Sequence, residues 1–130
     1  MLERLKISEY SFISDDKIKI WIQDDLVHYS VSIMEKGRSV KDKIADCSPE
    51  ELSTMLEDAQ IKNWKKQYMP EDLWMDGVEW SLEYKEAGEK AVRIKGSNAW
   101  PPEWEKLLEA VKKVAGNLGG MEESYRNDEN

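Results

Sequence analysis

The segment from Asp76 to Trp104 constrains the fold of this chain most, because it holds two strand patterns, a turn and a helix start. Apolar residues alternate with polar ones, first over residues 78–84 and then over residues 92–96. A period of two is typical of a strand with one buried face. The residues that share the buried face are Val78, Trp80, Leu82 and Tyr84 in the first stretch, and Val92, Ile94 and Gly96 in the second.

A three-residue loop over residues 86–88 is predicted to join these strands into an antiparallel hairpin. Gly88 is expected to take the left-handed backbone conformation that this loop type requires. The loop brings the two apolar faces onto the same side of the hairpin. The cross-strand pairs that follow are Leu82 with Val92, Trp80 with Ile94 and Glu79 with Lys95.

A second hairpin is predicted near the start of the chain, over residues 18–33. Its two strands alternate in the same way and are separated by Asp24-Asp25, which suit a two-residue turn. On this register Trp21 faces His28 on the polar side. The pairs on the apolar side are Ile22 with Val27, Ile20 with Tyr29 and Ile18 with Val31.

Two further strands are expected next to this hairpin, over residues 5–13 and 38–45. In the first, the apolar pattern changes phase near Ser8-Glu9, which predicts a β-bulge. Asp15-Asp16 are placed at the turn that follows. The second strand is interrupted by charged residues, so its pattern is weak.

Two helices are predicted from their start signals. Ser48 suits the N-cap of the first, Pro49 its first turn, and Glu51 completes a capping box three residues after the serine. The last helix is expected to begin after Trp100-Pro101, with Pro102 in its first turn, and shows helical spacing of apolar residues as far as Val114. Residues 61–75 have an irregular pattern and are expected to form the end of the first helix, followed by a connector that packs over the core.

These elements predict a single α+β domain over residues 1–118, followed by a disordered acidic tail over residues 119–130. The domain would contain an antiparallel sheet of about five or six strands, made of an N-terminal meander and a C-terminal hairpin, packed with two helices.

Composition excludes several classes of function. The formal net charge of −8 opposes binding to nucleic acid or to an anionic membrane, so a charged partner is expected to be a basic protein. No stretch has the length of a membrane span or the apolar core of a secretory signal, which predicts a cytoplasmic location. The single cysteine can form neither an internal disulfide nor, alone, a zinc site. No cofactor is expected.

The second half of the chain resembles a small domain that recurs in uncharacterised proteins of bacteria, particularly Firmicutes, and of their mobile elements. The pattern is D-G-x-x-W-x-L, then G-x-N-x-x-P-x-x-W. The residues that carry it are Ile61, Trp64, Tyr68, Asp76, Gly77, Trp80, Leu82, Gly96, Asn98, Pro101 or Pro102, and Trp104. The resemblance implies a bacterial origin. It implies no activity and no site residues, because none is assigned to that group.

No residue pattern points to catalysis. His28 is the only histidine, and no nucleophile signature lies near it in the sequence. Cys47 stands just before a predicted helix, where the helix dipole favours a thiolate, but no base accompanies it. The two aspartate pairs are explained by turns at opposite ends of one strand. We therefore expect no catalytic residue and no metal ligand in this chain.

The aromatic residues of the N-terminal strands are the remaining candidates. Tyr10, Phe12, Trp21 and His28 fall on the sheet face opposite the Ile18 and Ile20 set. Either a helix covers this face and the aromatic residues are core, or the face is open and forms a binding surface. The first interpretation follows from the usual burial of large aromatic residues and from the need of two amphipathic helices for apolar surface.

Three functions remain on this basis. The first is a non-enzymatic interaction module, of which an immunity-type protein that neutralises a basic toxin is a concrete form. The second is a binder of small ligands or carbohydrates that uses exposed aromatic residues. The third is a small hydrolase-like enzyme that uses His28 or an aspartate pair.

Overall fold

A computed structural model describes residues 1–12, 14–70 and 77–122. The strands and helices, in chain order, are β1 (Leu2–Ser11), β2 (Ser14–Gln23), β3 (Leu26–Ile33), β4 (Arg38–Ile44), α1 (Pro49–Asp58), the short 3₁₀ helix η1 (Ile61–Asn63), β5 (Gln67–Tyr68), β6 (Glu79–Glu86), β7 (Val92–Ser97), α2 (Trp104–Ala115) and the 3₁₀ helix η2 (Gly119–Glu122).

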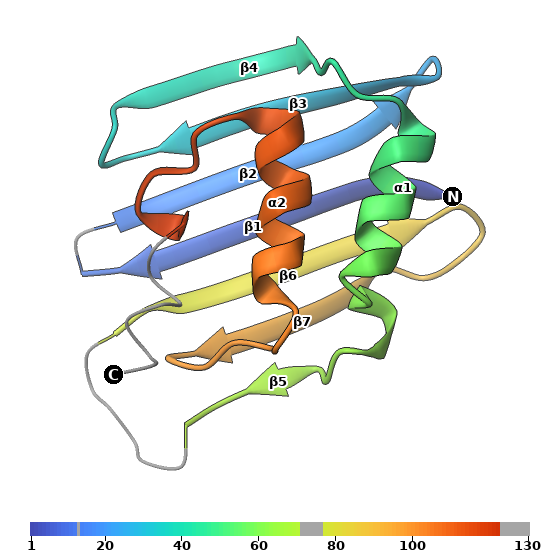
Figure 1. Cartoon of the computed structure of the whole chain (residues 1–130). Coiled ribbons are helices and arrows are strands. Elements are labelled where there is room, and N and C mark those ends of the chain that lie inside the picture. Colours follow the sequence, from blue (N-terminus) through green and yellow to red (C-terminus); the bar gives the residue numbers. More distant parts are fainter. Residues whose placement is uncertain (13, 71–76, 123–130) are drawn as a thin grey trace.

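The strands form one seven-stranded sheet in the order β4-β3-β2-β1-β6-β7-β5 (Figure 1). All neighbours are antiparallel except β5, which runs parallel to β7. The α+β class and the mostly antiparallel sheet are confirmed. The predicted strand count was slightly low, because β5 has only two residues and no alternating pattern can reveal so short a strand.

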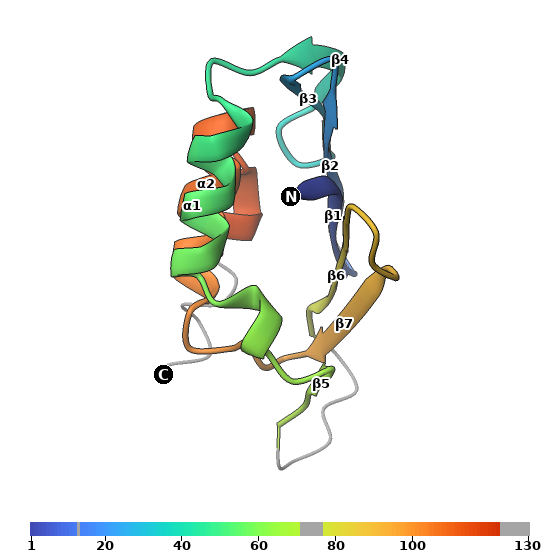
Figure 2. The same cartoon turned by 90° about the vertical axis from the view of Figure 1, so that its right-hand side faces the viewer.

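Both helices lie on the same face of the sheet (Figure 2). They pack side by side, and the core fills the space between them and the sheet. The expectation that a helix covers the face with Tyr10, Phe12 and Trp21 is therefore wrong. A sheet of seven strands spaced about 4.8 Å apart is wide enough to seat two helices about 10 Å apart on one side.

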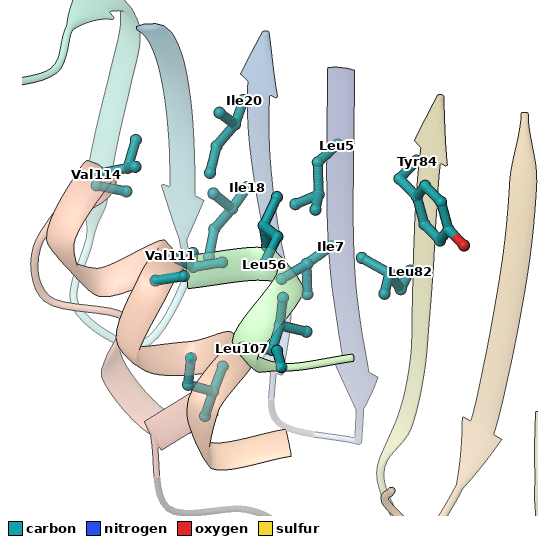
Figure 3. Close-up of a cluster of buried hydrophobic side chains, with 14 of the residues drawn as sticks. Leu5, Ile7, Ile18, Ile20, Leu56, Leu82, Tyr84, Leu107, Val111 and Val114 are labelled. Carbon is teal, nitrogen blue, oxygen red and sulfur yellow. The ribbon is translucent and has the colours of Figure 1, made fainter. Parts of the chain in front are cut away.

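The core is built from the apolar faces that the sequence pattern predicts (Figure 3). Strands β1, β2, β3, β6 and β7 contribute one layer, and the two helices contribute the layer that faces it. The side chains at its centre are Leu5, Ile7, Ile18, Ile20, Leu56, Leu82, Tyr84, Leu107, Val111 and Val114.

The β2–β3 hairpin has the predicted register, with Trp21 opposite His28 and Ile22 opposite Val27. Asp24 and Asp25 form the turn with φ values of 54° and 62°. Positive φ at both central residues is the geometry that matches the twist of the flanking strands, and aspartate tolerates it.

The β1–β2 hairpin differs from its prediction. The register runs without interruption from Arg4↔Trp21 to Ser11↔Ser14, so there is no bulge at Ser8-Glu9. Asp15 and Asp16 lie within β2, because the turn comes before Ser14. The apolar pattern changes phase because two carboxyl side chains, Glu9 and Asp16, occupy core-facing positions and are buried.

The β6–β7 hairpin forms with the predicted faces but a longer loop. Leu82 pairs with Ile94, Trp80 with Gly96 and Glu79 with Ser97, two residues from the predicted register. A shift by two keeps every side chain on its face, so apolar alternation cannot reveal it. Gly88 does take a positive φ, 78°.

The Trp80–Gly96 pair explains the observed register. A Cβ atom at Gly96 would lie 2.1 Å from the indole ring of Trp80, so the ring occupies the space that glycine leaves open. The indole Nε1 donates a hydrogen bond of 2.8 Å to the Ala99 carbonyl.

The start of α1 is as predicted. Ser48 Oγ accepts a hydrogen bond from Glu51 N, and the Glu51 side chain accepts one from Ser48 N, which completes the capping box. Helix α2 ends at Ala115, with Gly116 as its C-cap at a φ of 81°.

The folded domain extends beyond the predicted boundary at Leu118. Residues 119–122 form η2, and Met121 is fully buried. Gly119 has a φ of 62°, which allows the chain to turn back toward the sheet. The rest of the predicted tail, residues 123–130, and the connector residues 71–76 lie outside the described residues.

Candidate binding face

The sheet face that points away from the helices is called the open face here. Within the described residues, no helix or strand lies over it (Figure 2). Its side chains alternate along each strand with those of the core. On the five central strands they are His28, Ser30 and Ser32 (β3), Asp15, Lys17, Lys19 and Trp21 (β2), Arg4, Lys6, Ser8 and Tyr10 (β1), Glu79, Ser81, Glu83 and Lys85 (β6), and Arg93, Lys95 and Ser97 (β7).

The four predicted residues of this face fall into two pairs. Tyr10 and Phe12 stand at one end of β1 and are 61% and 96% exposed. Trp21 and His28 are cross-strand neighbours, half-buried, with ring centroids 5.6 Å apart and planes inclined by 19°. Trp21 lies opposite Arg4, six residues along β1 from Tyr10, which corresponds to about 20 Å. The structure therefore brings together the members of each pair, but not all four residues.

His28 has an acidic partner that the sequence did not indicate. Its Nδ1–H donates to Asp42 Oδ1 at 2.8 Å. Asp42 is placed there by a register irregularity between β3 and β4, and its φ is 44°. The only trace of this in the sequence is the broken alternation of residues 41–43.

Among the described residues, no side chain extends the His28–Asp42 pair at the other ring nitrogen of His28. The second ring nitrogen, Nε2, is buried and has no hydrogen-bond partner within the described residues. A general base needs this nitrogen to reach a nucleophile or a substrate proton. The pair therefore orients the imidazole ring against Trp21.

A shallow depression of about 440 Å³ lies on the open face beside Tyr10. Small or hydroxyl-bearing residues of β1, β6 and β7 contribute to its lining, and β5 closes one side. The lining residues with polar side chains are Ser8, Tyr10, Gln67, Tyr68, Glu79, Trp80, Ser81, Lys95 and Ser97.

The charge of the open face is opposite to that of the whole chain. Most of its charged side chains are basic, whereas the chain has a net charge of −8. Lys85 pairs with Glu3 at 2.7 Å, and Arg93 pairs with Glu83 at 2.9 Å. The basic residues of this face that form no ion pair within the described part of the chain are Lys6, Lys17, Lys19 and Lys95.

Lys6 and Lys19 are directly opposite each other on β1 and β2, and Lys17 is the next open-face residue along β2. We call Lys6, Lys17 and Lys19 the lysine cluster. It was missed from the sequence, because charged residues that alternate with isoleucines are the ordinary pattern of a solvated strand face.

The remaining sequence candidates are structural. Burial raises the pKa of the Cys47 thiol, and the nearby Glu51 carboxylate raises it further, so the helix start does not activate this cysteine. Asn98 Oδ1 accepts a hydrogen bond from Val78 N at 2.8 Å and holds the corner between β7 and α2. Gly77 has no Cβ, which leaves room for the Asn98 side chain.

The described residues contain no group of three or more metal-ligating side chains. No helix of the described part has the length and apolar character needed to cross a membrane. The comparisons with known proteins found no matching family model, no matching curated protein and no matching solved structure.

Proposed function

We propose that this chain is a non-enzymatic interaction module that acts in the bacterial cytoplasm and binds a protein partner through the open face of its sheet. The observation that carries the proposal is the exposure of Tyr10 and Phe12 on a sheet face that no described element covers. Exposed aromatic side chains supply much of the binding energy of protein interfaces.

The size of the face is compatible with this role. Five strands at a spacing of about 4.8 Å, each with about eight residues at 3.3 Å, give a face of roughly 600 Å². A standard interface buries about 800 Å² on each partner. The open face together with the adjoining turns therefore approaches the area that a specific complex needs.

The sheet edges are less suited to binding than the face. Strand β4 carries Lys41 and Lys43, and its pairing with β3 is irregular near Asp42. At the opposite edge, β5 has only two residues. Lysines, irregular pairing and short edge strands all oppose the addition of another strand. A partner is therefore expected to dock on the face.

An immunity-type role requires a partner that is basic overall, and the surface that suits such a partner lies elsewhere. Helix α1 exposes Glu50, Glu51, Glu57 and Asp58 and has no basic residue. A basic toxin would be attracted to this helix, on the side of the molecule opposite the open face. The aromatic residues of the open face favour that face as the principal docking surface.

The test compares capture of a partner by three forms of the chain from a lysate of the bacterium that encodes it. Tyr10→Thr combined with Phe12→Thr removes the two exposed aromatic side chains that carry the proposal. Met34→Thr is the control, because Met34 is 54% exposed in the β3–β4 turn. We expect a stoichiometric partner to be retained by the parent and by the control and lost from the double variant. Equal retention by the double variant, or no partner for the parent, would contradict the proposal.

A small-molecule ligand is the second candidate, favoured by the depression next to Tyr10. Its serine hydroxyls and the Gln67 amide could hydrogen-bond a sugar that stacks on the tyrosine ring. Trp64, Trp80 and Trp104 are buried, so they offer no open stacking surface. Amide shifts of Ser8, Ser81 and Ser97 in an NMR titration with a sugar panel would support this candidate, and unchanged spectra would remove it.

A further inference from the structure

The lysine cluster is not explained by the stability of the sheet. Directly opposed residues on neighbouring antiparallel strands have their Cβ atoms about 5 Å apart, and like charges at this spacing are destabilising. Lys6 and Lys19 are such a pair, and Lys17 adds a third positive charge on the same face. The repulsion between these like charges lowers the stability of the sheet. A surface whose charges are unfavourable for folding is a candidate binding surface.

Neighbouring acidic groups neutralise the cluster only in part. By register Glu83 lies beside Lys6 on the other side, but its carboxylate is already held by Arg93 at 2.9 Å and lies 4.0 Å from Arg4. The Arg93 guanidinium is the main cause of the lowered pKa of Glu83. Toward β3, the neighbours of Lys17 and Lys19 are Ser32 and Ser30, which carry no charge.

The surroundings of the cluster suit a chain that lies flat across the strands. Ser8 is opposite Lys17 on one side and Ser81 on the other, and Ser81 is opposite Lys95. Lys17 and Lys95 thus lie at the two ends of a row that crosses β2, β1, β6 and β7, with Ser8 and Ser81 between them. The serine side chains are short, so the surface between the lysines is lower than at the lysines themselves. The serine hydroxyls can donate hydrogen bonds to carboxylates.

From this arrangement we infer that the open face binds an acidic segment of a partner protein, with Lys6, Lys17, Lys19 and Lys95 contacting its carboxylates. The inference rests on the proposed function and names the chemistry of the partner at that face. It revises the expectation of a basic partner, which followed from the net charge of the whole chain.

A nucleic acid is the weaker occupant of the same surface. Affinity for a polyanion grows with the number of phosphates that are neutralised, and the four lysines can neutralise only about four. Asp15 and Glu79 lie on the same face on either side of Tyr10, and the net charge of −8 repels a long polyanion. A protein segment with a few carboxylates encounters less of this repulsion.

A second copy of the chain is also disfavoured. The acidic surface of α1 is complementary to the open face, but the two surfaces lie on opposite sides of the molecule (Figure 2). A contact between them would leave one free surface at each end and would lead to open-ended polymers.

The experiment combines a charge reversal with defined probes. Lys6→Glu/Lys19→Glu reverses the opposed pair. Lys90→Glu/Lys106→Glu is the matched control, because it makes the same change in net charge at exposed positions in the β6–β7 loop and on α2. The probes are a labelled twelve-residue peptide rich in Glu and Leu, a neutral Gly-Ser peptide of the same length, and a twelve-nucleotide thymidine strand. Binding is followed by NMR shifts of the parent and of both variants, with folding checked by circular dichroism.

We expect the acidic peptide to shift amides of β1, β2, β6 and β7, and the Lys6→Glu/Lys19→Glu variant to bind it at least about tenfold more weakly. The control variant is expected to bind it as the parent does, and added salt should weaken the parent's binding. The inference is overturned if the neutral peptide binds equally well, if the thymidine strand binds more tightly than the acidic peptide, or if the charge reversal has no effect. An apparent molar mass from light scattering that grows with the concentration of the protein alone would indicate polymers and would also overturn it.

The same variants separate this inference from the proposed function in the capture assay. If the aromatic double variant loses the partner while Lys6→Glu/Lys19→Glu retains it, the docking face stands and the acidic partner chemistry is wrong. If both variants retain the partner, the docking face itself is wrong.

Discussion

Glu9 and Asp16 lie directly opposite each other across β1 and β2, and both are buried on the core side of the sheet. Asp16 Oδ1 accepts a hydrogen bond from Met34 N at 2.9 Å, whereas Asp16 Oδ2 has no hydrogen-bond partner within the described residues. Burial raises the pKa of Asp16, and the negative charges of Glu35 and Asp15 add to this effect.

This arrangement predicts how stability depends on pH. Because the pKa of Asp16 is raised in the folded state, the folded chain binds its proton more tightly than the unfolded chain does. The cost of the buried charge is therefore absent below the unfolded value of about 3.9 and complete above the raised folded value. Asp16→Asn keeps an acceptor for Met34 N and carries no charge.

We expect Asp16→Asn to be more stable than the parent at pH 7.5 by about 1–3 kcal/mol, and the difference to shrink as the pH falls toward 4. Urea unfolding at both pH values measures this, with Asp15→Asn as a control at the exposed neighbour. A less stable Asp16→Asn variant at pH 7.5 would show that the buried charge is compensated.

The pair also shows where sequence patterns mislead. Apolar alternation located the strands around it, but two core-facing carboxyl groups imitated a change of phase and produced a false bulge and a misplaced turn. The β2–β3 register was predictable, because its turn residues and its apolar faces agree independently. The β6–β7 register was not, because a shift by two residues leaves the faces unchanged.

The location of the candidate face was only partly predictable. Tyr10, Phe12, Trp21 and His28 were assigned to one sheet face from their spacing, but whether a helix covers that face depends on how two helices share the width of the sheet. The alternation of Lys17 and Lys19 with isoleucines is visible in the sequence. The third member of the lysine cluster, Lys6, is placed beside them only by the pairing of β1 with β2. Asp42 reaches His28 only through the irregular pairing of β3 and β4.

The close approach of Trp80 to Gly96 predicts a specific effect of adding one methyl group. In Gly96→Ala the new Cβ would lie 2.1 Å from the indole, so the ring must move and strain its hydrogen bond to Ala99. Crowding in a packed core costs about 1–3 kcal/mol. Urea unfolding is the measurement.

The control is Gly37→Ala, which has a φ of 60° and open space around the new Cβ. It is expected to lose only about 1 kcal/mol from backbone strain. A loss for Gly96→Ala no larger than about 0.5 kcal/mol would mean that Trp80 does not fill the space above this glycine.

Asn98 is predicted to act through its carbonyl oxygen, which accepts from Val78 N at 2.8 Å. Asn98→Asp preserves this acceptor, and aspartate tolerates the φ of 53° at this position. Asn98→Ala leaves the Val78 N–H without its acceptor and is expected to lose about 1–3 kcal/mol of stability. Thermal unfolding of the two variants should separate them, with the larger loss for Asn98→Ala, and equal losses would contradict the role of the Oδ1 acceptor.

Cys47 is predicted to be a poor nucleophile. Its buried side chain and raised pKa keep it as the thiol, which reacts more slowly than the thiolate. Modification by Ellman's reagent at pH 8 should be at least about tenfold slower in the native chain than in urea. Equal rates in the two states would contradict the structural role of this cysteine.

The central claim, that the open face binds a protein partner, is tested most directly by photo-crosslinking in the living bacterium. The photoreactive amino acid p-benzoyl-phenylalanine replaces Tyr10, which is 61% exposed on the face, or Met34, which is 54% exposed in the β3–β4 turn. We predict a single adduct of defined mass from position 10, lost when Lys6→Glu/Lys19→Glu is added, and no such adduct from position 34. Equal adducts from both positions, or none from position 10, would contradict the claim.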